Sequence, residues 1–321
     1  MLSDSTIILL AMNNIKNFGT KTIINLYEEY QFVHNYTFSI DTFFTFLLEH
    51  KKVTYEVVEE LKKNIESVNY ELSKNEVQEM KIVTFFDQQY PIQLKLLKNP
   101  PLFLFCKGNI ELLSSLKNIA VVGTRENSKI GKQVAIKTAE YFASQGYTIV
   151  SGLAKGIDAA GHIGALNVGG KTIAILTGLI KIYPAENRYL AEDILNNNGL
   201  LFSEIAPWKN IYRSAFVDRD RLQSGMSLGT FVIETDIKGG TMHTVRFTLE
   251  QNRHLFVPDF NVLNYEKGFS KINGTKYLLQ EGKAKAYFKE NYEEIIKLLK
   301  NKEEEVLGEY KKVEENKRRL I

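Results

Sequence analysis

Five polar segments between residues 123 and 244 each follow an apolar run, and four of them place a basic residue beside glycine. Glycine lets a ligand approach the backbone closely, and N–H groups at the start of a following helix attract an anion. A helix terminus contributes only about 0.3–1 kcal/mol per charge at an exposed site, so basic side chains must supply most of the affinity. This combination is typical of phosphate binding. The segments are 123–131, 151–162, 177–188, 203–227 and 235–244.

The first segment, 123–131, differs from a dinucleotide-binding loop. A Gly-x-Gly-x-x-Gly loop brings backbone alone against a pyrophosphate, whereas Gly-Thr-Arg projects a long cationic side chain to a phosphate further out. Arg125 can hold that phosphate through two parallel N–H bonds, and Lys155 adds a point charge. We therefore expect a ligand with a phosphate backbone rather than NAD. The candidate DNA- or phosphate-binding residues are Gly123, Thr124, Arg125, Lys155, Gly156, Arg188, Arg219, Arg221, Gly240 and Thr241.

The segment around Arg219 and Arg221 carries mixed charge, because Asp218 and Asp220 interleave with the two arginines. The arginines could contact phosphate, or they could form ion pairs with these aspartates or with Glu204. The residues alone leave both interpretations open. Two positive and two negative charges in one segment weaken its attraction for a polyanion.

Two other pairs of residues also have a functional and a structural interpretation. Asp158 and His162 lie four apart, on one helix face, and could act as an acid–base pair. An Asp in a first helical turn also offsets the helix dipole, so the structural role is the favoured interpretation. Trp208 and Tyr212 could stack on bases or pack within a loop. There is no second His or Cys at ligand spacing, so we expect no metal and no catalytic residue.

Apolar runs that alternate with helical patterns must position these segments. The expected strands are 119–123, 147–152, 172–178, 200–204, 230–235 and 254–258, and the helical patterns between them include 131–146 and 156–170. Strands that are apolar throughout indicate a parallel sheet covered on both faces. The sequence therefore predicts an α/β fold, an extended Rossmann-like, doubly wound and mostly parallel sheet. In such a sheet, ligands bind beyond the carboxyl ends of the strands.

The pattern divides the chain into three parts. Residues 1–76 have helical spacing and predict a small all-helical domain of the helix-hairpin-helix or SAM-like type, for which a plain packing role is favoured. Residues 77–290 form the Rossmann-like domain, and their first part, 80–110, has two short β-rich runs that suit a connector. Residues 291–321 predict a charged helical tail, to which we assign no chemistry.

Composition limits the class of protein. The 321 residues are 44% hydrophobic and 25% charged, with a net charge of +3, as in an ordinary globular protein. The apolar runs fall far short of the roughly 18 residues that a membrane helix needs, and the N-terminal segment lacks the basic start of a signal peptide. The single cysteine, Cys106, excludes an internal disulfide. We expect a cytoplasmic protein with no membrane contact.

The polar segments and their flanks resemble, in order and spacing, the DNA-processing protein A (DprA/Smf) family. The resemblance covers about residues 90–285 and rests on stretches such as "AVVGTRENSKIGKQVA", "IVSGLAKGIDAAGHIGAL" and "KGGTMHTVRFTLEQNRHLFVP". It implies an extended Rossmann-like domain that uses no nucleotide cofactor and binds single-stranded DNA in a basic pocket. It also implies a homodimer that protects incoming DNA and loads the RecA recombinase onto it in natural transformation.

The resemblance carries the family's motifs onto particular residues. Its Gly-Ser/Thr-Arg loop falls on 123–125, its Ser-Gly-Leu-Ala motif begins at Ser151, its Tyr-Pro-x-Glu-Asn-Arg falls on 183–188, and its double-arginine motif falls on 216–227. This sequence departs from the pattern in three ways. Asp220 replaces the asparagine between the two arginines, the Ser-Gly-Ser/Thr loop reads Gly-Gly-Thr at 239–241 with a histidine two residues later, and the C-terminal winged helix of many members has no visible counterpart.

Two other function classes stay open. A Rossmann-like sensor could bind a nucleotide-derived ligand in the same pocket, an alternative that the Asp218 and Asp220 pair and the absent winged helix leave open. A nucleotide phosphoribohydrolase is a third interpretation, because "KGGTMHT" resembles that family's Pro-Gly-Gly-x-Gly-Thr-x-x-Glu motif. Thr244 stands where that family has its catalytic glutamate, and threonine supplies no carboxylate for glycosidic cleavage. Glu204 or Glu234 could take its place only in an altered fold.

Overall fold

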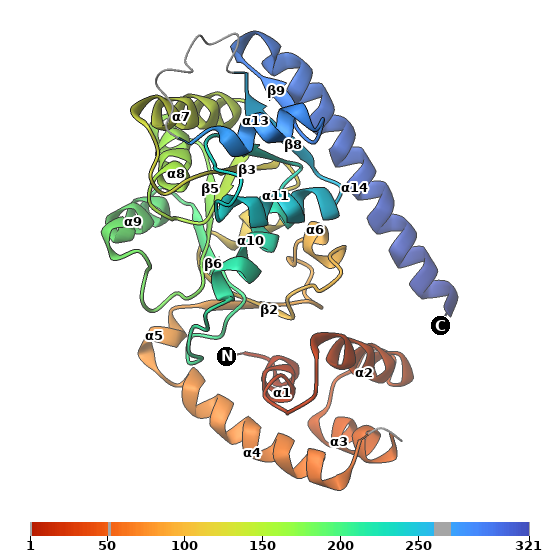
Figure 1. The fold of residues 1–321 in the computed structure, drawn as a ribbon. Coiled ribbons are helices and arrows are strands. Elements are labelled where there is room, and N and C mark those ends of the chain that lie inside the picture. Colours follow the sequence, from red (N-terminus) through yellow and green to blue (C-terminus); the bar gives the residue numbers. More distant parts are fainter. Residues whose placement is uncertain (1, 51–52, 260–270, 321) are drawn as a thin grey trace.

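The computed structural model describes residues 2–50, 53–259 and 271–320, and these form one nine-stranded sheet with helices on both faces. Figure 1 shows the sheet in the upper part of the molecule and the N-terminal helices below it. The strands are β1 (Lys81–Thr84), β2 (Phe103–Gly108), β3 (Asn118–Val122), β4 (Thr148–Ser151), β5 (Thr172–Ile175), β6 (Leu200–Ser203), β7 (Gly229–Val232), β8 (His254–Pro258) and β9 (Lys285–Tyr287). The helices are α1 (Asp4–Met12), α2 (Thr20–Val33), α3 (Ile40–Glu49), α4 (Tyr55–Leu72), α5 (Asn75–Gln78), α6 (Ile92–Lys95), α7 (Lys129–Ser144), α8 (Ile157–Asn167), α9 (Arg188–Asn196), α10 (Ala215–Gly225), α11 (Thr241–Glu250), α13 (Asn273–Gln280) and α14 (Tyr292–Leu320).

The strand order is β1-β2-β6-β5-β4-β3-β7-β8-β9. The strands from β6 to β9 are parallel, and β2 and β1 extend the β6 edge as antiparallel strands. The chain moves outward from β3 through β4, β5 and β6, then crosses back to β7, so the strand order reverses between β3 and β7. The predicted mostly parallel, doubly wound α/β fold is confirmed, and each of the six predicted strands is present. The sequence pattern did not reveal β9, because its three residues are too short to show a period.

The two faces of the sheet bury alternate residues of each strand, as the two-residue period of a strand requires. Ile119 and Val121 pack with residues of α7, α8 and α14, whereas Ala120 and Val122 pack with residues of α11 and α13. Because the four central strands β3, β4, β5 and β7 are buried along their whole length, their mostly apolar residues do not alternate with exposed polar ones. The core therefore fixes the strand ends, and with them the loops that follow.

The N-terminal helices and the last helix meet on one side of the sheet. The core of α1 to α4 is continuous with the apolar residues around β1, β2 and β6, and the rings of Tyr27 and Phe86 lie 4.5 Å apart. Helix α14 crosses the molecule from β9 to α2, where Lys317 pairs with Glu28 at 2.6 Å (Figure 1). The charged pattern of this tail led to the prediction of a solvated helix, but Leu299 on its first half is fully buried.

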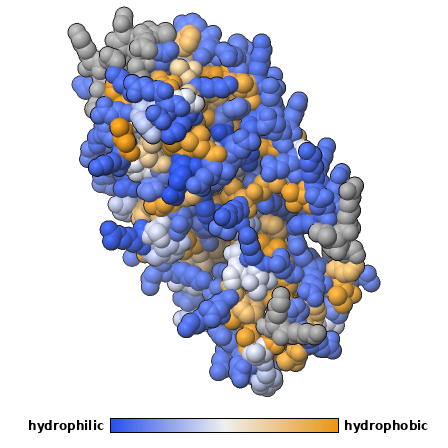
Figure 2. All heavy atoms as spheres, turned by 45° about the vertical axis from the view of Figure 1, so that its right-hand side comes forward, coloured by the Kyte–Doolittle hydropathy of each residue, from blue (hydrophilic) through white to orange (hydrophobic). Residues whose placement is uncertain are grey.

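Hydrophilic side chains cover much of the face that α14 crosses, with apolar patches between them (Figure 2). Within the described residues, no helix is both long and apolar enough to cross a membrane.

Candidate nucleic-acid interface

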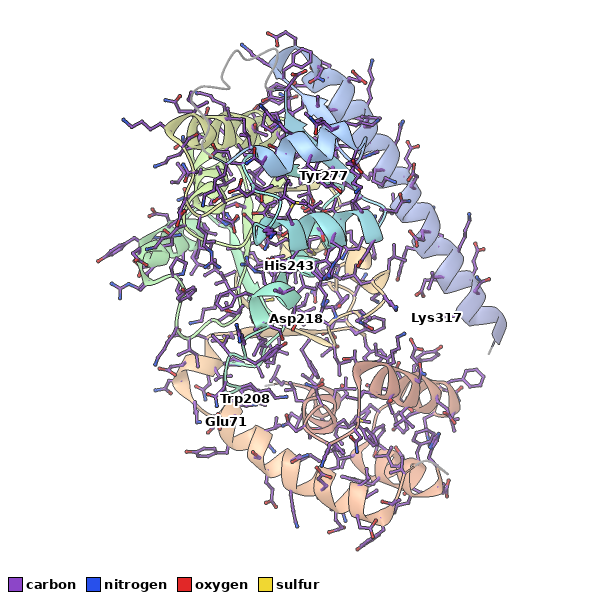
Figure 3. All side chains as sticks on the ribbon, in the orientation of Figure 1. Glu71, Trp208, Asp218, His243, Tyr277 and Lys317 are labelled. Atoms are coloured by element: carbon purple, nitrogen blue, oxygen red, sulfur yellow. The ribbon has the colours of Figure 1, made fainter. Side chains whose placement is uncertain are left out.

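A pocket of about 480 Å³ opens at the carboxyl ends of β3 and β7, at the point where the strand order reverses. Ligands of doubly wound folds bind in this position. The wall is made by the loops after β3, β4 and β7 and by one side of α10 and the start of α11. Its lining includes Gly123, Thr124, Arg125, Ala154, Asp158, Phe216, Arg219, Asp220, Gln223, Gly240, Thr241, His243, Thr244 and Lys271. Figure 3 marks His243 in the first turn of α11 and Asp218 on the neighbouring α10.

The loops after β3 and β4 pack tightly against each other, which explains two of their glycines. Gly156 has a φ of 84°, and a Cβ there would lie 2.4 Å from the carbonyl oxygen of Thr124. A Cβ on Gly123 would lie 2.6 Å from a side-chain carbon of Ile157. Any larger residue at either position would push the two loops apart. The glycines therefore hold Arg125 in place rather than contributing side-chain chemistry of their own.

Arg125 stands between the large pocket and a second pocket of about 420 Å³. Its guanidinium carbon lies 6.0 Å from the centre of the Phe216 ring, and Phe216 in turn makes an edge-on contact with Tyr183 at 5.4 Å. Phe216 and Arg125 line both pockets, so the two cavities are neighbours with a cation and an aromatic ring on the shared wall. This arrangement can bind an anion beside a flat, apolar group.

Lys155 and Tyr183 line the second pocket together with Pro184 and Thr177. The Lys155 ammonium pairs with Glu186, and both side chains are more than half exposed, so solvent screens the pair strongly. A ligand phosphate could therefore replace Glu186 at little cost. Trp208 does not reach this region and makes an edge-on contact with Phe105, at the end of the sheet that faces the N-terminal helices (Figure 3).

Arg219 lies beneath both pockets rather than on their rim. Its side chain is 8% exposed, its Nη1 donates to the carbonyl oxygen of Ile175 at 3.2 Å, and its Nε lies 3.4 Å from Asp220. A Cβ on Gly152 would fall 1.2 Å from this Nη1, so the guanidinium fills the space that the glycine leaves. The buried charge of Arg219 therefore adds positive potential to both pockets from below.

The structure does not bring Arg221 and Arg188 to these pockets. Arg221 pairs with Glu204 and lines a different cavity of about 260 Å³, beside Trp208. Arg188 begins α9, where its side chain is 61% exposed and lies 3.9 Å from Glu192. Of the ten candidate residues, six line the 480 Å³ pocket: Gly123, Thr124, Arg125, Arg219, Gly240 and Thr241. Lys155 lines the 420 Å³ pocket.

Asp158 and His162 do not form an acid–base pair. The Asp158 carboxylate accepts from the N–H groups of Gly152 and Ala154, and burial raises its pKa. The His162 ring shares a hydrogen bond with Thr172 at 2.6 Å, and burial lowers its pKa to about 3, so the ring is neutral at physiological pH. Asp158 thus holds the loop after β4 to α8, and His162 holds α8 to β5.

Glu234 occupies the helix terminus at which a Rossmann fold usually holds phosphate. Its carboxylate accepts from the backbone N–H of Ser128 at 2.8 Å and from the Ser128 hydroxyl at 2.7 Å, at the start of α7. The residue is fully buried. One signal is visible in the sequence, an acidic residue just after a buried apolar strand, but its partner lies 106 positions away. The chain's own carboxylate thus fills the anion position at α7.

Asp220 and Gln223 were not identified as a unit from the sequence. Gln223 donates to the Asp220 carboxylate at 2.9 Å, and both side chains line the larger pocket. Burial raises the pKa of Asp220 to about 6, although the Arg219 guanidinium acts in the opposite direction. Among the described residues, no group of three or more His, Cys, Asp or Glu side chains could hold a metal ion.

Comparison with known proteins places this site in a family context. A family model described as DNA recombination-mediator protein A matches residues 81–300. The DNA processing protein DprA of Streptococcus pneumoniae is 38% identical over 212 residues, which cover 66% of this chain and 72% of that protein. DprA of Bacillus subtilis is 38% identical over 170 residues, which cover 53% of this chain and 57% of that protein. Protein Smf of Escherichia coli is 39% identical over 168 residues, which cover 52% of this chain and 45% of that protein. The match thus spans about half the length of the latter two proteins.

Two solved structures are similar. The X-ray structure of DprA from Streptococcus pneumoniae has a TM-score of 0.68 and 28% identity, covering 89% of this chain and 95% of that one. A DNA processing protein A structure from Helicobacter pylori, described as giving insight into a single-stranded DNA binding mode, has a TM-score of 0.57 and 28% identity, covering 72% of this chain and 97% of that one. The strand-end pockets thus lie on a chain that belongs to the DNA recombination-mediator protein A family, the group of the DprA and Smf proteins.

Proposed function

We propose that this protein binds single-stranded DNA across the two adjoining pockets. The observation that carries the proposal is the position of Arg125, a cation beside Phe216 on the wall shared by both cavities. Successive nucleotides of a single strand alternate an anion with a flat base, and this wall offers a partner for each. The description of the Helicobacter pylori relative as binding single-stranded DNA supports the same ligand class.

In this proposal, phosphates contact Arg125, Lys155 and the backbone N–H groups at Gly240 and Thr241. Gly123, Thr124 and Gly156 shape the loops that hold these groups, and Arg219 adds positive potential from below. Arg188 and Arg221 are left outside the binding set because neither lines either pocket, and Arg221 pairs with Glu204 in another cavity. Bases would lie against Phe216 and Tyr183, where each stack contributes about 1–3 kcal/mol.

The biological role that we propose follows the family. The protein would protect incoming single-stranded DNA in the cytoplasm and load the RecA recombinase onto it during natural transformation, acting as a homodimer without a cofactor. The names of its relatives, DNA processing proteins, support a role on DNA, and the resemblance of the strand-end loops to the family's motifs supports a common binding mode. The proposed role is one of binding rather than catalysis.

Fluorescence anisotropy with a labelled oligothymidine, measured across a salt series, tests the DNA proposal. We expect Arg125→Ala to weaken binding and to lower the slope of log K against log salt by about 0.7, the value for one lost phosphate contact on a single strand. Arg246→Ala is the matched control, because Arg246 is an exposed arginine on α11 that pairs with Glu250 outside the pockets. An equal change of slope in both variants, or no binding to the oligonucleotide at low salt, would refute the proposal.

A nucleotide-derived ligand is the second candidate, and the size of the larger pocket favours it. A volume of about 480 Å³ lies within the range of about 300–1,000 Å³ that small-molecule sites occupy. A thermal-shift screen with mononucleotides and cyclic nucleotides distinguishes the two candidates, since a bound ligand raises the melting temperature. The phosphoribohydrolase alternative has less support. Glu234 caps α7 and Glu204 pairs with Arg221, so neither residue is placed to act as the catalytic carboxylate of a phosphoribohydrolase. Release of free base from a nucleoside monophosphate would support this alternative.

A further inference from the structure

The cavity of about 260 Å³ beside Trp208 lies where the N-terminal helices meet the sheet, and we call it the junction pocket. Three parts of the chain form its wall: the end of α1 with the start of α2, the connection between β1 and β2, and the loop after β6. Figure 3 marks Trp208 on the side of the sheet that faces the N-terminal helices. The volume of the pocket falls below the range of about 300–1,000 Å³ that small-molecule sites occupy, so it suits one flat group rather than a whole cofactor.

Asparagine side chains without partners of their own line the junction pocket. Asn13 and Asn14 follow the end of α1, Asn99 lies in the connection before β2, and Asn210 lies in the loop after β6. Within residues 2–50, 53–259 and 271–320, none of these four side-chain amides forms a hydrogen bond. Each amide offers two N–H donors and a carbonyl acceptor. Amides of this kind pair with the mixed donors and acceptors on the edge of a nucleobase.

Aromatic rings and an unpaired cation line the same pocket. Trp208 and Tyr212 supply the rings, and Tyr212 is 48% exposed. Glu204 and Arg221 neutralise each other in the wall. Lys209 is the other cation of the lining, and its ammonium has no ion pair in the part of the chain that the structure describes. Aromatic rings beside a free cation suit a base and its phosphate, as in proteins that bind single strands.

The junction pocket lies close to the pockets at the strand ends. The loops after β5 and β6 touch each other, because a Cβ on Gly178 would lie 3.3 Å from Cδ1 of Ile211. Thr177, beside Gly178, lines the 420 Å³ pocket, and Tyr212, beside Ile211, lines the junction pocket. Tyr212 and Phe216 are four positions apart, so their Cα atoms are separated by at most about 14 Å. A stacked strand rises about 3.4 Å per nucleotide, so about four nucleotides cover this span.

We propose that the junction pocket is a further nucleotide subsite, in which a base stacks on Trp208, the lining asparagines contact the edge of that base, and Lys209 contacts a phosphate. This inference rests on the proposed binding of single-stranded DNA and extends the strand from the strand-end pockets to the N-terminal helices. Those helices then take part in binding through Asn13 and Asn14, besides their role in packing.

Strand length separates this subsite from the strand-end pockets. An oligothymidine of four residues is too short to occupy both places, whereas one of twelve residues reaches both. Anisotropy titrations should show Trp208→Ala binding the longer strand about tenfold more weakly than the wild type, as expected for one lost stack, and the shorter strand equally well. Equal weakening at both lengths, or none at either, would overturn the subsite while leaving DNA binding intact. Failure of the wild type to bind either strand would instead overturn the proposed function.

Two polar side chains test the subsite without altering the core. Lys209→Ala should lower the slope of log K against log salt by about 0.7 on the longer strand alone, and Lys63→Ala, at an exposed position on α4 outside the three pockets, should not change it. Asn14→Ala should weaken the longer strand by about threefold, with Asn69→Ala on α4 as its control. A slope that is equal in Lys209→Ala and Lys63→Ala, or full affinity in Asn14→Ala, would show that the strand does not reach the junction pocket.

Discussion

At the scale of single residues, the two arginines of α10 show how strongly position on a helix decides a role. Arg219 and Arg221 look equivalent in the sequence, yet residues two apart on a helix point about 200° away from each other. Arg219 lies under the pockets with its guanidinium on the backbone of Ile175, whereas Arg221 pairs with Glu204 in another cavity. Only the first can add its field to the phosphate site.

The buried carboxyl of Asp220 predicts how the free energy of unfolding depends on pH. Burial raises its pKa from 3.8 to about 6. The native state therefore holds more protons than the unfolded state between about pH 4 and 6, and the free energy of unfolding falls as pH rises through this window. The charged groups facing it are Arg219 on its own helix, Arg125 after β3 and Asp158 on α8, with the Thr244 hydroxyl on α11.

Asp220→Asn should therefore be more stable than the wild type by about 1–3 kcal/mol at pH 8, where the buried charge is fully present. The difference should shrink as pH falls toward 4, because the wild-type carboxyl is then protonated. Urea denaturation at the two pH values measures it. Asp218→Asn, at a partly exposed position, should change the unfolding free energy little at either pH. A stability gain of Asp220→Asn that stays constant with pH would contradict the assignment.

At the scale of elements, the start of α7 explains why the proposed phosphate ligand is an arginine. In a dinucleotide-binding fold the helix after the first strand holds the pyrophosphate. Here Glu234 fills that position, and a Cβ on Gly131 would lie 2.3 Å from its Oε2. Because Glu234 already neutralises the terminus of α7, the remaining groups that could bind an anion are the Arg125 side chain and the start of α11. The first turn of α11 contains no acidic residue.

Glu234→Ala is the test at this scale. The substitution removes both acceptors of Ser128 and leaves a partly buried N–H unpaired, so we expect a loss of about 2–3 kcal/mol in unfolding free energy. Chemical denaturation measures the loss. Glu126→Ala is the matched control, since its side chain is 80% exposed and its contact with Lys271 lies at the surface. Similar small losses in the two variants would show that Glu234 does not stabilise α7.

At the scale of the whole molecule, the last helix contacts the N-terminal helices. The second half of α14 reaches α2, where the Lys317 ammonium lies 2.6 Å from Glu28 and 5.6 Å from the ring of Phe85 (Figure 3 marks Lys317). The first half of α14 is anchored on the sheet through Leu299 and Val306. Helix α14 thus connects the Rossmann-like sheet to the N-terminal helices by a second route, besides the connector around β1.

A double-mutant cycle tests this connection. Each side chain of the Glu28 and Lys317 pair is more than a third exposed, so we expect a coupling energy of only about 0.5 kcal/mol between Glu28→Ala and Lys317→Ala. The coupling should vanish in about 1 M salt, where the Debye length is about 3 Å. The pair Lys62 and Glu59 on α4 offers a local control within one helix. A coupling energy above about 1.5 kcal/mol, or one insensitive to salt, would mean that the contact is not a surface ion pair.

The sequence determined the fold and the location of the site. Each central strand is a continuous apolar run because both of its faces are buried, and glycine with basic residues marks the loops that follow. These are local properties, so a chain read in short windows reveals them. The family motifs on the same loops led to the same family that the comparisons show.

The tertiary structure decided which charged side chains face the pockets. Glu234 meets Ser128 across 106 positions, and Arg219 reaches Ile175 across 44, so neither contact leaves a trace in local spacing. The burial of Leu299 on a charged helix and the burial of Gln223 on α10 depend in the same way on what packs against them. A residue's type fixes the chemistry that it can perform. Its neighbours in space fix whether its charge is neutralised inside the protein or offered to a ligand, and those neighbours are set by the packing of the whole sheet.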